Sequence, residues 1–116
     1  MQVAVASYCL AVAALMGLWW GVEIRNGAVS RPDRSRGEIA LHLAAESATV
    51  LLLAIGGIVL GGGGSRWVAL VGLGMLLYTV IQSPGYFVAR HELAPVVMFA
   101  VLALLTIGAI VATATL

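Results

Sequence analysis

The chain has 116 residues, of which 62% are hydrophobic and 9% are charged, and its formal net charge is +1. Soluble domains carry about 25% charged residues, so a soluble fold of this size could not bury this much apolar surface. A net charge close to zero also provides no basic field for binding nucleic acid. The composition therefore predicts one integral membrane domain, residues 1–116, whose main partner is the lipid bilayer.

Four apolar runs are long enough to cross a membrane as helices, which takes about 20 residues each. They cover residues 3–21, 39–60, 67–83 and 95–113. Four consecutive glycines separate the second run from the third, and a Ser-Pro-Gly sequence should end or sharply kink the third run. The predicted fold is therefore all-α, an integral membrane up-down bundle of four helices.

The first run has the length of a signal peptide, but it lacks a basic start and an Ala-x-Ala cleavage site. It ends in two tryptophans, which suit the aromatic belt at a membrane interface. We therefore interpret it as a retained span. Ala13, Gly17 and Gly21 form a row of small residues along it, which we expect to serve ordinary packing inside the bundle.

The arginines are distributed unequally between the two sides of the predicted bundle. Loops 22–38 and 84–94 fall on the same side, and together they carry Arg25, Arg31, Arg34, Arg36 and Arg90. The opposite side has Arg66 alone. The positive-inside rule therefore places both loops in the cytoplasm and both termini outside, in a multi-pass protein of the cell (inner) membrane.

One ionisable pair lies inside the second span. His42 and Glu46 are four residues apart and share one face of a helix. At ~1.5 Å per residue, Glu46 lies roughly 10 Å into the span from its cytoplasmic end. The up-down topology predicts further polar residues at a similar depth or at the rim of the same end: Tyr78, Gln82, Arg25 and Arg90. The sequence therefore predicts a polar cluster in the cytoplasmic third of the bundle.

The first interpretation of this cluster is structural. An unpaired carboxylate in hydrocarbon costs several kcal/mol, so Glu46 needs a partner. Tyr78 or Gln82 could bond to it, and Arg25 or Arg90 could pair with it. In this interpretation the cluster fixes the register of the helices.

The second interpretation is a ligand or proton site, because ionisable residues inside a membrane are functional by default. Glu46 could exchange protons, with His42 as the relay towards the cytoplasm. A small amphiphile such as a quinone or a lipid headgroup could then lie against Trp19, Trp20 and Tyr78.

The third interpretation is a metal site made of His42, Glu46, His91 and Glu92, whose imidazole and carboxylate groups suit iron or zinc. His91 and Glu92 are adjacent in a predicted loop and would rarely point at one ion together. We therefore predict no metal site and no cofactor. No nucleophile arrangement is visible in the sequence, so an enzyme is not predicted either.

The second and third spans resemble one known family. The residues that carry the likeness are Ala44-Ala45-Glu46, Leu51-Leu52-Leu53, Gly56-Gly57 and Ser65-Arg66-Trp67-Val68-Ala69-Leu70. They resemble the DoxX-like group of small four-span membrane proteins, in which an early Glu of the second span precedes a Gly-rich apolar stretch. The resemblance implies a four-helix bundle with a membrane redox or quinone-linked accessory role, and Glu46 as the candidate functional position.

The predicted function is an accessory or small-ligand-binding component of the membrane. The alternative is a proton-coupled small-molecule transporter that acts as a dimer, with Glu46 as the proton carrier. Small multidrug transporters have a similar length, but they carry their essential Glu in the first span, which here has no charge. A homo-oligomer or a larger membrane complex fits either prediction, because one four-span bundle has little room for a transport pathway.

Overall fold

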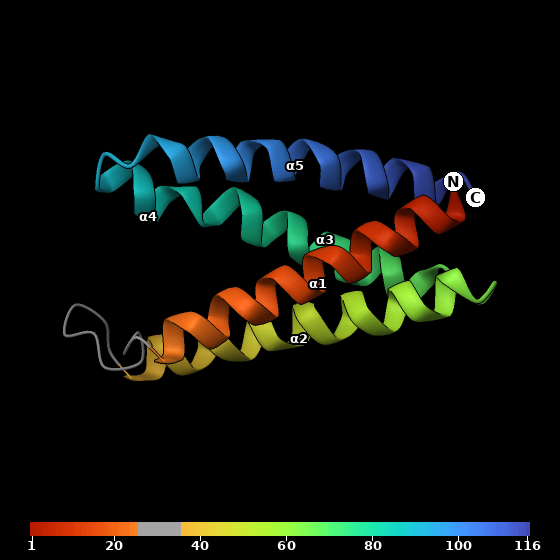
Figure 1. Ribbon diagram of the computed structural model, residues 1–116, viewed down its shortest axis with the longest axis horizontal. Helices are drawn as coiled ribbons and strands as arrows, with labels where there is room; N and C mark the ends of the chain where they lie inside the picture. Colours follow the sequence, from red (N-terminus) through yellow and green to blue (C-terminus); the bar gives the residue numbers. More distant parts are fainter. Residues whose placement is uncertain (26–35) are drawn as a thin grey trace.

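The computed structural model describes residues 1–25 and 36–116. The regular elements in these ranges are helices: α1 (Gln2–Arg25), α2 (Arg36–Gly61), α3 (Trp67–Gln82), α4 (Pro84–Ala89) and α5 (Leu93–Ala114). The four long helices run alternately up and down, with both chain ends at one end of the bundle (Figure 1). We call this the terminal end and the opposite one the α4 end. The all-α prediction is therefore confirmed.

Four stretches of the described residues are long and apolar enough to cross a membrane: Gln2–Val22, Gly37–Gly61, Trp67–Ala89 and Leu93–Ala114. Large apolar side chains point outward from them, and Leu104, for example, is 71% exposed. Water-soluble monomers rarely expose contiguous apolar surface on this scale. Length and composition thus fit a multi-pass membrane protein, while insertion itself stays a prediction.

The third span is longer than the sequence predicted. The backbone of Ser83, the residue after α3, stays helical, and α4 begins directly at Pro84. Proline is tolerated in the first turn of a helix because the N–H that it lacks would have no partner there. The loop predicted at residues 84–94 therefore shrinks to residues 90–92.

The arginines that the structure describes lie as the topology predicted. Arg25 ends α1 and Arg90 follows α4, both exposed at the α4 end, whereas Arg66 precedes α3 at the terminal end. The guanidinium of Arg66 donates a hydrogen bond of 3.1 Å to the carbonyl of Ala114 and so satisfies one of the last carbonyls of α5. Arg31 and Arg34 lie outside the described residues.

Glycines let α2 and α3 approach closely. A Cβ on Gly56 would lie 2.6 Å from the backbone N and Cα of Ala69, and one on Gly72 would lie 3.0 Å from the backbone of Leu52. The small residues expected to pack in α1 behave differently, because Gly17 and Gly21 have nothing within 4 Å of such a Cβ. The packing prediction for these two glycines is therefore wrong.

A Schellman motif ends α2. Gly63 has a φ of +85°, a conformation that glycine adopts without strain. Its N–H donates to the carbonyl of Leu60, and the N–H of Gly64 donates to the carbonyl of Val59 at 2.8 Å. The run of glycines is thus a tight helix stop, which turns the chain back into α3.

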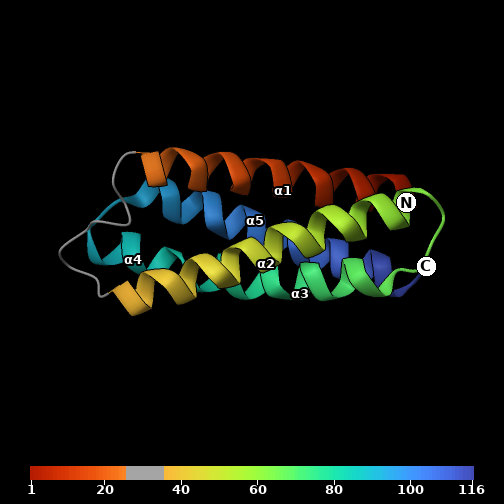
Figure 2. The same ribbon diagram turned by 90° about the horizontal axis from the view of Figure 1, so that it is seen from below.

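The α1 and α5 helices meet near the terminal end and separate towards the α4 end (Figure 1). The hydroxyl of Tyr8 in α1 lies 2.8 Å from that of Thr106 in α5, and Thr106 in turn donates to the carbonyl of Leu102 at 2.7 Å. Otherwise α5 packs mainly on α3 and α4. Figure 2 shows α2 running obliquely across the bundle between α1 and α3. The α1 and α5 helices therefore diverge towards the α4 end.

Candidate functional site

A cavity of about 340 Å³ lies between the diverging α1 and α5, with lining residues from all five helices. Its lining is apolar for the most part. Four aromatic side chains contribute to it: Trp19, Trp20, Phe87 and Phe99. The polar side chains on its wall are Glu46, His42, Thr79 and Ser83. The predicted polar cluster therefore exists in part, and it borders a cavity.

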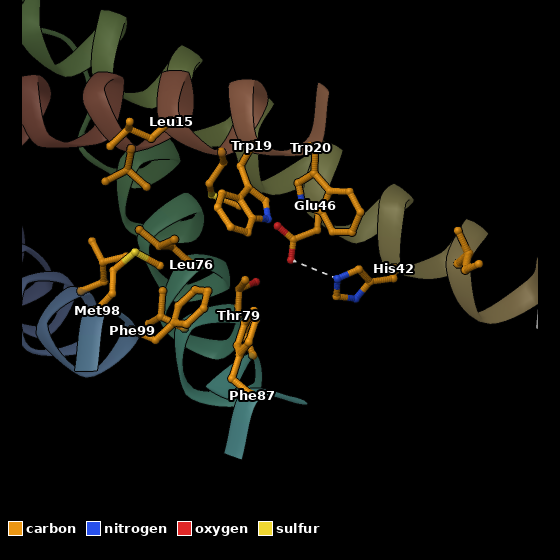
Figure 3. Close-up of a pocket in the computed structure, with 16 residues that line it drawn as sticks. Leu15, Trp19, Trp20, His42, Glu46, Leu76, Thr79, Phe87, Met98 and Phe99 are labelled. Carbon is orange, nitrogen blue, oxygen red and sulfur yellow. Dashed lines mark ion pairs between the residues drawn. The ribbon is translucent and has the colours of Figure 1, made fainter. Parts of the chain in front are cut away.

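Glu46 is the buried acid of this cavity, with only 5% of the residue exposed. Side-chain hydrogen bonds from Trp20 and Thr79 reach its carboxyl group, and the Nε2 of His42 lies 3.8 Å from its Oε1 (Figure 3). Because these partners come from α1, α3 and α2 itself, the carboxyl group joins three helices at one point. Donors of this kind offset the cost of removing a carboxylate from water.

His42 lies one turn before Glu46 on the same face of α2, as the spacing predicted. Its ring meets the indole of Trp20 edge to face, with centroids 5.1 Å apart. The imidazole side chain is 31% exposed, compared with 7% for that of Glu46. His42 therefore lies on the side of Glu46 that leads out of the bundle.

Two of the predicted site residues lie elsewhere. Tyr78 is 67% exposed and lines a separate shallow hollow between α2 and α3, together with Ala45 and Gly74. Gln82 is exposed as well. The residue of α3 that reaches Glu46 is Thr79, which follows Tyr78 in the chain. The prediction found the right turn of α3 but the wrong side chain. Each residue rotates a helix by about 100°, and the depth of a residue along the axis does not say which side chain faces Glu46.

The predicted rim partners, Arg25 and Arg90, are exposed at the α4 end. The groups that interact with the Glu46 carboxyl are Trp20, His42 and Thr79 instead. The Glu46 carboxyl group therefore interacts with an indole, an imidazole and a hydroxyl group, and not with the guanidinium group of Arg25 or Arg90 that was predicted as one possible partner.

The geometry of the described residues does not support the metal interpretation. Among the described residues, no three His, Cys, Asp or Glu side chains come together as ligands. His91 has a φ of +58° and ends α4 in a second Schellman motif, in which the N–H of Glu92 donates to the carbonyl of Phe87 at 3.0 Å. Its position is that of a helix stop at the surface.

Sequence reasoning missed the hydrogen-bonding role of Trp20. It treated this tryptophan as an interfacial anchor and as a wall for a ligand, and it overlooked the indole N–H, a donor that seeks a partner when buried. The signal was available, because Trp20 and Glu46 are at similar depths in antiparallel neighbouring spans. Phe87 could not be found in this way, because residues 84–94 were predicted to be a loop.

The cavity opens sideways. Leu15 and Trp19 on α1 and Met98 on α5 all line it, yet they are 63%, 52% and 44% exposed. Figure 3 shows Leu15 and Met98 on opposite walls, from the two helices that separate. In a bilayer, this opening would face the lipid rather than water.

The buried polar groups of the described residues are satisfied inside the fold. Every buried side-chain nitrogen or oxygen in the described residues has a hydrogen-bond partner. Cys9, the free cysteine, is buried away from this cavity in the core between α1 and α2. The site thus combines one held carboxyl group with a large apolar and aromatic wall.

Comparison with the curated proteins and with the solved structures finds no match. The likeness to the DoxX-like group therefore stays a prediction from the sequence. A family model does match residues 1–115, which is nearly the whole chain. The chain belongs to the family described as a domain of unknown function, DUF8058.

Proposed function

We propose that this protein is a membrane-embedded binding component, which holds one small amphiphilic molecule in the cavity between α1 and α5. The observation that carries the proposal is the buried carboxyl group of Glu46 on the wall of an otherwise apolar cavity. Ligand sites of this kind are mostly apolar, with a few placed polar groups that fix orientation. The polar end of the ligand would lie at Glu46 and His42, and its apolar body would lie against α1 and α5.

The proposal includes a membrane orientation. The α4 end would face the cytoplasm, because it carries Arg25 and Arg90 whereas Arg66 is at the other end. The cavity would then lie near the cytoplasmic side of the bilayer. An accessory role in membrane redox or quinone chemistry rests on the DoxX-like resemblance alone.

A proton-coupled carrier is the second candidate, and the 3.8 Å contact between Glu46 and His42 favours it as a proton route. Alternating access would require a second opening, towards the terminal end. In the described residues that half of the bundle holds a packed core, which includes Val5, Leu60 and Leu73. We therefore favour binding over transport. Uptake into proteoliposomes that follows a pH gradient and disappears in Glu46→Gln would reverse this preference.

The test of binding uses the tryptophans of the cavity. Trp67 lies outside the cavity lining, so Trp67→Phe leaves Trp19 and Trp20 as the fluorescent reporters. The protein in nanodiscs is titrated with a neutral short-chain ubiquinone analogue and, separately, with the methyltriphenylphosphonium cation. We expect saturable quenching by at least one of these two probes.

A chemical block identifies the place of binding. In a Cys9→Ala background, Met98→Cys and Val97→Cys are labelled with cyclohexylmaleimide; Met98 lines the cavity, whereas Val97 is its exposed neighbour and does not. The label at position 98 should weaken binding by about tenfold or more, which is about 1.4 kcal/mol. Equal binding by both labelled proteins, or no saturable quenching by either probe, would rule the proposal out.

A further inference from the structure

We infer that the occupant of the cavity is a lipophilic organic cation, taken up sideways from the bilayer. This inference rests on the proposed function, and it narrows the class of ligand. It is carried by the polarity of the groups around the cavity, by its aromatic walls and by the position of its opening.

The polar groups of the cavity wall favour a positive charge. Glu46 is its carboxylic acid, and none of the arginines in the described residues lines it. Two of the donors on the wall, the Trp20 indole and the Thr79 hydroxyl, are already engaged with the Glu46 carboxyl group; His42 and Ser83 are the other polar side chains there. These two donors hold the Glu46 carboxyl group in place, where it can pair with a bound cation, whereas a quinone oxygen would have to compete with Glu46 for Trp20 and Thr79.

Aromatic rings surround the same point. Trp19 and Trp20 lie on the α1 side of the carboxyl group, and Phe87 and Phe99 lie across the cavity from α4 and α5 (Figure 3). The two phenylalanine rings stack with centroids 5.9 Å apart. A cation over the face of an aromatic ring is attracted by the ring, most strongly when it is desolvated, and Trp is the best such ring.

The opening between α1 and α5 determines where such a ligand comes from. Leu15, Trp19 and Met98, which border it, are apolar side chains that a bilayer would solvate. A strongly hydrated ion would have to lose its water before reaching this entrance. A lipophilic cation dissolved in the membrane interface would meet the entrance directly, and only its charged centre would need the carboxyl group.

The test compares two probes of nearly the same shape. Methyltriphenylphosphonium and 1,1,1-triphenylethane differ in one central atom, which is positively charged phosphorus in the first and neutral carbon in the second. Both are titrated against the Trp67→Phe protein in nanodiscs of zwitterionic lipid, so that the lipid surface does not concentrate the cation. We expect the cation to bind at least tenfold more tightly, corrected for partitioning into empty nanodiscs.

Two substitutions link that preference to the carboxyl group. Glu46→Gln keeps the shape and a hydrogen-bond acceptor, and should remove the preference for the cation over the neutral probe. Glu46→Asp keeps the charge and should retain most of the preference. A gel-filtration profile that matches that of the Trp67→Phe protein shows that the Gln variant is folded.

The inference is overturned if the two probes bind equally, or if Glu46→Gln keeps the full preference for the cation. In either case saturable binding that the label at position 98 blocks would leave the proposed function standing. Loss of all saturable binding, including that of the ubiquinone analogue, would remove both. The two failures are therefore distinguishable.

Discussion

At the scale of single residues, the carboxyl group of Glu46 is what ties the site to the fold. Trp20 from α1 and Thr79 from α3 bond to it, and His42 from its own helix approaches to 3.8 Å. The hydrogen bonds of an isolated pair inside a membrane protein average only about 0.6 kcal/mol and reach about 1.7 kcal/mol. Because the acceptor here can carry a charge, we expect each bond to lie towards the upper end of that range.

Thr79→Val tests one of these bonds, with Tyr78→Phe as its neighbouring control. The valine keeps the shape but removes the hydroxyl that reaches Glu46, so the free energy of unfolding should fall by about 1–2 kcal/mol. Tyr78 is exposed outside the cavity, and its hydroxyl should change stability by less than about 0.5 kcal/mol. Both values can be measured by steric trapping in bicelles. A larger loss for the Tyr78 variant would contradict the assignment of the α3 partner.

Helix geometry explains which parts of this site could be predicted from the sequence. That His42 and Glu46 share one face of α2 depends only on the period of one helix, and this was predicted correctly. The partner on α3 depends on the rotation of a second helix, which an apolar run without a clear polar face does not specify. The Trp20 bond depends on a side-chain direction as well, so it could be found only once α1 and α2 were packed together.

At the scale of elements, glycine spacing sets how closely α2 approaches α3. A Cβ on Gly56 would clash with the backbone of Ala69, whereas Gly17 and Gly21 of α1 have room for one. The pattern of apolar spans alone could not distinguish these two kinds of glycine. The spans were predictable because length and hydropathy are properties of a single helix. Which glycines lie at a close contact between helices depends on how the neighbouring helix packs, so these glycines were not predictable. The continuation of the third span beyond Pro84 is a similar case, because a proline that starts a helix and one that ends a helix look alike in the sequence.

Gly56→Ala should separate α2 from α3. The added Cβ would meet backbone atoms at 2.6 Å, and backbone cannot move aside cheaply, so we expect a loss of about 1–3 kcal/mol in the free energy of unfolding. Gly74→Ala is the matched control on α3, because nothing lies within 4 Å of its Cβ. That change should cost nothing and could add about 0.5 kcal/mol through helix propensity. Equal losses in steric-trapping measurements would mean that α2 and α3 are not in the close contact described.

At the scale of the whole molecule, an asymmetry runs along the bundle. The terminal end is held by packing and by short bonds, such as that between Tyr8 and Thr106. The α4 end is open between α1 and α5, and it holds the cavity, the buried acid and the exposed Arg25 and Arg90. A molecule built in this way can bind at one end while the other keeps the helices together, which agrees with a binding role.

The central claim is that a small amphiphile rests against Glu46 inside the bundle. Solid-state NMR can test it directly, through the dipolar coupling between the carboxyl carbons of ¹³C-labelled glutamate and the ³¹P of bound methyltriphenylphosphonium. We expect ³¹P to dephase the carboxyl signal that Glu46→Gln removes, while the side-chain carboxyl signals of the other three glutamates, Glu23, Glu38 and Glu92, stay unchanged. Bound ligand with no dephasing of the Glu46 signal, or with dephasing at other glutamates alone, would contradict a ligand site at Glu46.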